Sequence, residues 1–128
     1  MTPAIKLAEK SGIPFKVHSY VHDANAVSYG LEAAEKLAVD PTRVFKTLVV
    51  STDKDELLVA VIPVAEKLSM KQIAKVAAAK KAMMAEQTKV ERSTGYVLGG
   101  VSPIGQKKRL KTYIDDSAQQ QATIFCMM

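Results

Sequence analysis

The sequence predicts an α+β fold in which helices surround a mixed, barrel-like β-sheet. Two observations support this class. Helix-like and strand-like segments are interleaved along the chain, and several strand-like segments follow one another through connections too short for a helical crossover, which parallel neighbours would need. The 128 residues, of which 48% are hydrophobic and 24% charged, match the size and composition of one soluble globular domain. We therefore expect residues 1–128 to form a single domain.

The N-terminal segment predicts a helix followed by a strand. Thr2 can cap the free amide groups of a helix, Pro3 suits its first position, and Gly12 provides a stop. Residues 13–20 then alternate between apolar and polar side chains, which is the pattern of a half-buried strand.

The next part of the chain predicts a loop and a second helix. Residues 21–30 are typical of a loop. Residues 31–39 place apolar side chains, beginning with Leu31, at helical spacing. Asp40 and Pro41 then break the helix.

The remaining segments predict a hairpin, a helix and short strands. The β-branched runs 44–51 and 56–64 are joined by a short polar turn and predict two neighbouring buried strands. Ser69 and Gln72 have the spacing of a capping box and predict the start of a helix over 70–82. Residues 90–93 predict a helical turn. The other strand candidates are residues 82–85, 110–115 and 121–128.

Lys46 is conspicuous because it interrupts the apolar run of residues 44–51. An ammonium group removed from water without a partner is costly, so something should compensate its charge. One explanation is an edge-strand lysine whose stem lies on apolar surface while its ammonium group reaches solvent. The other is a lysine at the floor of a pocket, where it would bind an anionic or carbonyl group of a ligand. The residue pattern leaves both explanations open.

Tyr20 and His18 share one side of the predicted strand, and His22 follows. A phenol can donate a hydrogen bond in a site and a histidine can exchange protons, but a tyrosine at the core boundary and two solvated histidines fit the same pattern. No partner for a catalytic triad is evident. Two histidines with the single Cys126 make a zinc site improbable, and one cysteine cannot form an internal disulfide.

The stretch GGVSP, residues 99–103, lies just before Lys107, Lys108 and Arg109. A glycine pair permits unusual backbone angles, so successive amide groups can point at one spot and stabilise an oxyanion or hold a phosphate. A simple tight turn is the alternative. The cations suit a nucleic-acid backbone, although a solvated rim has the same composition. The net charge of +5 also favours polyanionic partners, although many solvated surfaces carry a similar surplus of cations.

Seven stretches occur in order over nearly the whole chain: TPAIKL, HSYVHD, YGLEAAEKL, FKTLVV, RSTGY, GGVSPIGQKKR and QATIF. Together they resemble the YbaK-like family of aminoacyl-tRNA deacylases, the free-standing relatives of the editing domain in bacterial prolyl-tRNA synthetase. FKTL followed by STGY and GGVSPIGQKKR is the most specific part. The GQKKR stretch is closer to the cysteine-specific branch of the family than to the alanine-specific one.

The resemblance implies an α+β, barrel-like editing domain that hydrolyses the ester of mischarged Cys-tRNA(Pro) without a metal or other cofactor. The family's essential lysine corresponds to Lys46, and its G-x-x-x-P loop corresponds to residues 99–103. Catalytic roles are implied for Lys46, Gly100 and Ser102, substrate contacts for Tyr20, Tyr29, Thr47, Gly99, Val101 and Pro103, and tRNA contacts for Lys107, Lys108 and Arg109. An aminoacyl ester is already activated, so orientation and oxyanion stabilisation can suffice, with or without attack by the substrate's own thiol.

The resemblance also implies partners and a location. The acceptor end of a mischarged tRNA is the expected partner, prolyl-tRNA synthetase is a further one, and the cytoplasm is the expected compartment. Relatives continue past the position of Met128 with a glycine-rich basic stretch, an acidic pocket residue and a closing helix, so the chain is expected to lack that segment. Two alternatives stay open: an enzyme that prefers Ala-tRNA(Pro), and a non-catalytic module that binds tRNA or a synthetase.

Overall fold

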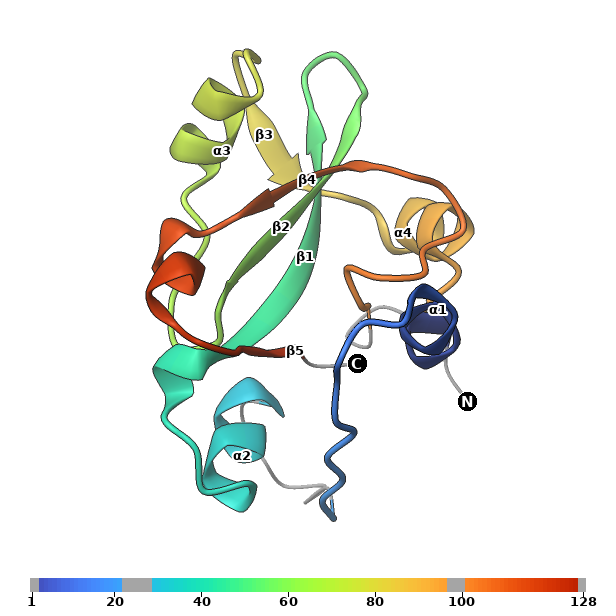
Figure 1. The fold of residues 1–128 in the computed structure, drawn as a ribbon. Helices are drawn as coiled ribbons and strands as arrows, with labels where there is room; N and C mark the ends of the chain where they lie inside the picture. The colour runs from blue at the N-terminus through green and yellow to red at the C-terminus, as the bar shows by residue number, and fades with distance from the viewer. Residues whose placement is uncertain (1–2, 22–28, 97–100, 127–128) are drawn as a thin grey trace.

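The computed structural model describes residues 3–21, 29–96 and 101–126, and their arrangement is α+β, as predicted (Figure 1). Within these residues the helices are α1 (Pro3–Ser11), α2 (Tyr29–Lys36), α3 (Met70–Val76) and α4 (Gln87–Thr94), with 3-10 turns at Pro41–Arg43 and Asp116–Gln120. The strands are β1 (Val44–Thr52), β2 (Leu57–Pro63), β3 (Ala82–Met84), β4 (Lys111–Ile114) and β5 (Phe125–Cys126). None of the helices in the described ranges combines the length and apolar character that a bilayer span requires.

The five strands form one mixed sheet with the order β3-β1-β2-β4, and β5 pairs with β1. The predicted hairpin is confirmed, because β1 and β2 pair antiparallel from Phe45 opposite Pro63 to Ser51 opposite Leu57. β4 pairs parallel with β2, and β5 pairs parallel with β1. The predicted barrel-like closure is not confirmed, because the path of paired strands among the described residues has two ends and stays open.

One edge of β1 is shared by two short strands that leave a gap between them. β3 pairs with the end of β1 at residues 50–52, and β5 pairs with its beginning at residues 44–45. Lys46 and Thr47 therefore lie in the stretch of β1 that these two strands leave uncovered on that edge.

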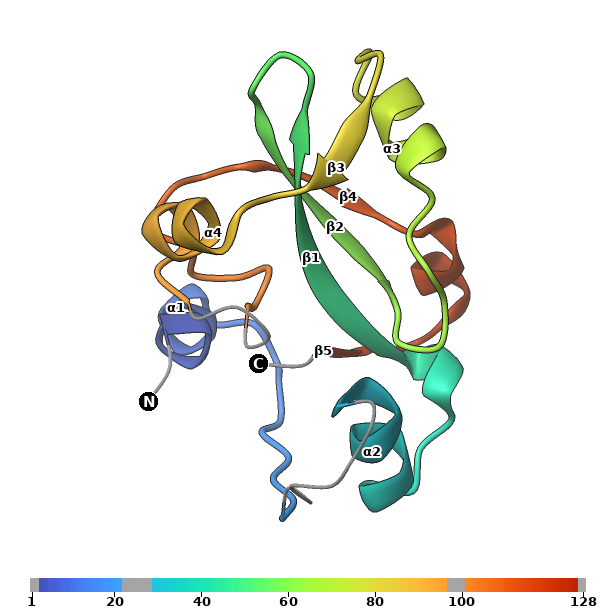
Figure 2. The ribbon, with the colours of Figure 1, turned by 180° about the vertical axis from the view of Figure 1, so that it is seen from behind.

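The core has two parts because successive side chains of a strand point to opposite faces of the sheet. On one face, Val44 and Val50 of β1 pack with Ala34 of α2 and Ile73 of α3, respectively. On the other face, Val49 packs with Val90 of α4, Tyr96 and Val101, and Phe45 packs with Val59 and Val61. Figures 1 and 2 show α3 and α2 at opposite ends of β1 and α4 beside α1.

The predicted stop at Gly12 and the predicted start at Ser69 are confirmed, and Gly95 and Asp40 act at two further helix ends. Gly12, just after α1, has φ +71°, and Gly95, just after α4, has φ +79°, which are left-handed values that glycine adopts without strain. Ser69 caps α3 by accepting a hydrogen bond from the Gln72 backbone amide at 3.2 Å. Asp40 accepts one from the Thr42 amide at 2.9 Å and so begins the 3-10 turn.

The predicted strand over residues 13–20 is wrong. This segment has no regular secondary structure, and the apolar side chains that should have been buried are exposed: Ile13 by 56%, Phe15 by 43% and Val17 by 55%. Alternation along a chain specifies two faces, but a strand also needs a neighbouring edge to pair with. The predicted loop over 21–30 falls mostly outside the described residues.

Three helix predictions need smaller corrections. α2 begins at Tyr29 and buries Ala33 and Ala34, so Leu31, expected on the apolar face, is 44% exposed. The helix predicted over 70–82 ends at Val76, because Ala78 turns to φ +57° and closes the helix despite the alanine-rich sequence that follows. The turn predicted at 90–93 is the second half of the longer helix α4.

Candidate functional site

Lys46 lies half-buried on β1, opposite Ile62 of β2. Its ammonium group donates a hydrogen bond to the backbone carbonyl of Val64 at 3.3 Å, which gives the half-buried cation a polar partner. Val64 packs with Val44 and with Ala34 of α2. The ammonium group therefore lies at the corner where α2 meets the β1–β2 hairpin.

Tyr20 and Glu32 lie close to each other near α2. Tyr20 is half-buried at the end of the exposed segment 13–21, whereas Glu32 of α2 is only 7% exposed. Burial raises the pKa of the Tyr20 phenol, and the negative charge of Glu32 raises it further, so this phenol stays a neutral hydrogen-bond donor at neutral pH. The sequence offered no signal for a buried acid here, because Glu32 lies on the side of α2 turned away from Ala34.

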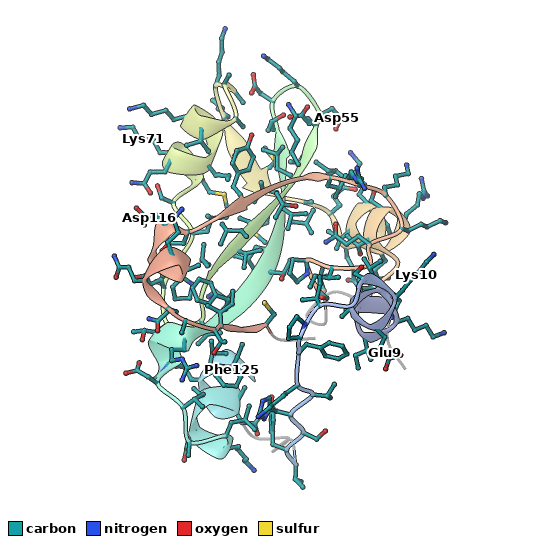
Figure 3. All side chains as sticks on the ribbon, viewed as in Figure 1. Glu9, Lys10, Asp55, Lys71, Asp116 and Phe125 are labelled. Atoms are coloured by element: carbon teal, nitrogen blue, oxygen red, sulfur yellow. The ribbon has the colours of Figure 1, made fainter. Side chains whose placement is uncertain are left out.

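An aromatic contact holds the segment that carries Tyr20. The ring of His18 lies 5.2 Å from the ring of Phe125, and the Arg43 guanidinium lies 5.1 Å from the centre of the same Phe125 ring. Phe125 belongs to β5 at the end of the sheet next to α2 (Figure 3). The contact therefore attaches the otherwise irregular segment 13–21 to the sheet, two residues before Tyr20.

Thr47 and Val101 lie on the face of the sheet opposite Lys46. Thr47 is half-buried and, by strand alternation, shares its face with Phe45 and Val49. Val101 is buried against Val49 on that face. Thr47 and Val101 therefore lie on one face of the sheet. The Lys46 ammonium group bonds to Val64 on the opposite face.

The rest of the predicted loop is described from residue 101 onward. Gly99 and Gly100 lie outside the described residues, and so does the side chain of Tyr29. Ser102 is 1% exposed, and its hydroxyl oxygen accepts a hydrogen bond from the Ile104 amide at 3.2 Å. Its carbonyl accepts another from the Gln106 side-chain amide at 3.0 Å, and Pro103 is half-buried. The Ser102 side chain is therefore engaged within its own turn.

The predicted cations follow this turn and stay exposed. Lys107 and Lys108 donate their backbone amides to the carbonyls of Thr94 and Ser93, each at 2.9 Å, so the chain lies against the C-terminal end of α4. Their side chains, with that of Arg109, are consequently presented to solvent beside α4.

The comparisons with known proteins agree with one another. A family model described as the aminoacyl-tRNA editing domain matches residues 24–127. EbsC of Enterococcus faecalis (strain ATCC 700802 / V583), named as a candidate Cys-tRNA(Pro)/Cys-tRNA(Cys) deacylase, is 37% identical over 123 residues, covering 96% of this chain and 74% of that protein.

Two solved structures share the fold. The protein APE2540 superposes with a TM-score of 0.82 at 20% identity, over 98% of this chain and 81% of that one. A candidate trans-editing enzyme for prolyl-tRNA synthetase superposes with a TM-score of 0.70 at 20% identity, over 81% of this chain and 65% of that one. The match to the family model and the identity with EbsC show that the chain belongs to the aminoacyl-tRNA editing domain family, as the resemblance to the YbaK-like deacylases indicated.

Proposed function

We propose that this protein is a trans-editing deacylase that hydrolyses the ester bond of mischarged Cys-tRNA(Pro). The observation that carries the proposal is the 37% identity with EbsC in an alignment that covers 96% of the chain. Membership of the aminoacyl-tRNA editing family supports the reaction class and tRNA as the partner.

Hydrolysis of an aminoacyl ester requires the protein to orient the substrate and to stabilise the developing charge. The ester is activated, so a positioned cation and a set of backbone amides can stabilise the charge that develops on the carbonyl oxygen. In the proposal, the substrate lies at the edge of β1 that β3 and β5 leave uncovered. Lys46 binds the terminal adenosine or the carbonyl region from one face of β1, and the backbone of residues 99–103 surrounds the scissile carbonyl from the other, with Gly100 and Ser102 as its central members. Because the Ser102 hydroxyl is buried and bonded to Ile104, we assign Ser102 a role through its backbone.

Substrate selection would come from a small pocket. Tyr20, Tyr29 and Thr47 are the proposed side-chain walls, and Gly99, Val101 and Pro103 the proposed wall from the loop. A pocket of limited size admits cysteine and excludes the larger proline ring, and the free-energy difference for such steric discrimination is a few kcal/mol. The exposed cations Lys107, Lys108 and Arg109 would hold the tRNA backbone without reading its sequence. Prolyl-tRNA synthetase, on which specificity for tRNA(Pro) would then depend, is the proposed docking partner.

The test is a rate comparison across charged tRNAs. The purified chain is mixed with Cys-tRNA(Pro), Ala-tRNA(Pro), Pro-tRNA(Pro) and Cys-tRNA(Cys), and ester hydrolysis is followed with and without prolyl-tRNA synthetase. We expect the fastest turnover for the cysteinyl esters and none above background for Pro-tRNA(Pro). Faster hydrolysis of Ala-tRNA(Pro) than of the cysteinyl esters would show that the protein is the alanine-specific deacylase instead. Binding of tRNA without any turnover would contradict the deacylase proposal and support the non-catalytic binding module.

A further inference from the structure

We propose that Tyr96 is a positioning residue that ties the loop containing Ser102 to the N-terminal end of α1. The inference rests on the proposed function, in which the backbone of residues 99–103 contacts the acyl group. It gives a role to α1, a helix to which none of the proposed site residues belongs. Figures 1 and 2 show α1 and α4 on the same side of the sheet, with the segment that follows residue 101 near both.

The Tyr96 hydroxyl links three parts of the chain. Tyr96 is 8% exposed, and its hydroxyl donates a hydrogen bond to the Ile104 carbonyl at 2.7 Å. Burial raises the pKa of this phenol, while hydrogen bonds from the Ser102 side chain and from the Ala4 backbone amide act in the opposite direction. A phenol can donate once and accept as well, so one oxygen serves the loop on one side and α1 on the other.

The bond to Ala4 matters because it satisfies a helix terminus. The first amide groups of an α-helix have no partner within the helix, and Ala4 belongs to the first turn of α1. Ala4 is 5% exposed, so water cannot easily replace the phenol. A buried amide group left without a partner is destabilising. Loss of the Tyr96 hydroxyl should therefore loosen α1 as well as the loop.

Gly105 provides independent evidence that the loop and α1 are in direct contact. A Cβ atom at this position would lie 2.7 Å from the carbonyl carbon and oxygen of Pro3 and 2.9 Å from the Ala4 nitrogen. Backbone atoms cannot move aside as the end of a flexible side chain can. The two segments consequently meet through their main chains, with no space for a side chain between them.

The ring of Tyr96 is held from the opposite side by α4 and the sheet. It packs with Val49 of β1, Val90 of α4 and Val101. Its backbone amide donates to the Thr94 hydroxyl at 3.1 Å, and that hydroxyl donates to the Val90 carbonyl at 2.7 Å. Tyr96 therefore fixes the position of the loop relative to β1, the strand that carries Lys46. A displacement of about 1 Å between catalytic groups can cost on the order of 100-fold in rate, so this link bears directly on turnover.

The first experiment compares Tyr96→Phe with Tyr113→Phe. The first variant removes the hydroxyl and keeps the ring, and the second makes the same change at a half-buried tyrosine that packs with Val50 and Leu58 on the other face. Single-turnover hydrolysis of Cys-tRNA(Pro) is measured at saturating protein, together with the tRNA dissociation constant. For Tyr96→Phe we expect the rate constant to fall about tenfold or more with an unchanged dissociation constant. Tyr113→Phe should keep the wild-type rate. A rate within twofold of wild type for Tyr96→Phe overturns the proposal.

The second experiment does not depend on catalysis. Amide hydrogen exchange is followed at residues 4 and 5 and at the non-proline residues of 101–106 in the wild type, Tyr96→Phe and Gly105→Ala. We expect both segments to lose protection together in both variants, since either change separates them. Faster exchange in one segment without the other would disprove the tie. If the wild type hydrolyses no aminoacyl-tRNA, the proposed function and the positioning role both fail, whereas the tie between loop and α1 is still decided by exchange.

Discussion

The guanidinium group of Arg43 lies 5.1 Å from the centre of the Phe125 ring, and the same arginine donates a hydrogen bond to the Thr123 hydroxyl at 2.7 Å. His18 contacts the same ring from the other segment, so Phe125 attaches segment 13–21 to β5 while Arg43 holds the Phe125 ring. Nothing in the local sequence of this segment indicates such an attachment. It joins residues from three distant parts of the chain around one aromatic side chain.

We predict that Phe125→Leu lowers the free energy of unfolding by about 1 kcal/mol, since the cation–π and ring contacts are lost while apolar bulk is kept. Urea unfolding measures this loss. Limited proteolysis should also cut earlier within residues 13–21. Phe15→Leu is the matched control, because Phe15 is 43% exposed and should change neither measurement by more than a few tenths of a kcal/mol. Equal behaviour of the two variants would show that the contact does not hold the segment.

Lys46→Ala should lower the single-turnover rate on Cys-tRNA(Pro) by about 100-fold or more, the usual effect of removing one group that stabilises a developing oxyanion. The fold should survive, because the half-buried side chain makes its hydrogen bond to a backbone carbonyl at the hairpin end. Circular dichroism and the unfolding midpoint check that point. Normal deacylation by Lys46→Ala would refute the assigned role and leave the edge-lysine explanation.

Gly105→Ala and Gly12→Ala form a matched pair for the contact between the loop and α1. Both glycines have left-handed φ values, +74° and +71°, so both substitutions carry backbone strain of roughly 1–2 kcal/mol. A Cβ at Gly12 meets nothing within 4 Å, whereas one at Gly105 meets backbone at 2.7 Å. Gly105→Ala should therefore lose about 1–3 kcal/mol more in urea unfolding. Similar losses would mean that the two segments are not in close contact.

The exposed cations give a prediction about salt. Replacing Lys107 and Lys108 by Gln should weaken tRNA binding to a similar extent for all tRNAs. The slope of log affinity against log salt should decrease by about one for each cation that meets a phosphate. Lys71→Gln with Lys75→Gln on α3 is the control, since α3 lies at the other side of the fold (Figure 3). If the α3 pair weakened binding and the first pair did not, the tRNA surface would be on α3.

Asp53 gives a prediction about acid stability. Hydrogen bonds from the backbone amides of Lys81 and Lys80, at 3.2 and 3.0 Å, hold the pKa of this carboxyl below its ordinary value of 3.8. The charged form is thus favoured by folding, so its contribution is present above pH 3.8 and is lost as pH falls through the lower folded-state pKa. Asp53→Asn should show a smaller decrease in unfolding free energy between pH 6 and pH 3 than the wild type. Identical decreases in urea unfolding would contradict this.

The sequence by itself determined features whose interactions span a few residues. Ser69 caps α3 through Gln72, Gly12 ends α1, and two β-branched runs pair across a short turn. The family resemblance, carried by ordered motifs, was also readable without coordinates and agrees with the family match. Each of these depends on groups adjacent in the chain or on the identity of the residues themselves.

The tertiary structure decided which surfaces are covered and which distant groups meet. Residues 13–20 alternate like a strand but pair with none of the described strands, and α2 buries Glu32 while exposing Leu31. The partnership of Tyr96, Ile104 and Ala4 joins the N-terminal helix to residues 96–104, and nothing in local spacing indicates it. Burial and long-range hydrogen bonds depend on what the rest of the chain places opposite a residue, and a pattern within one segment carries no information about that neighbour.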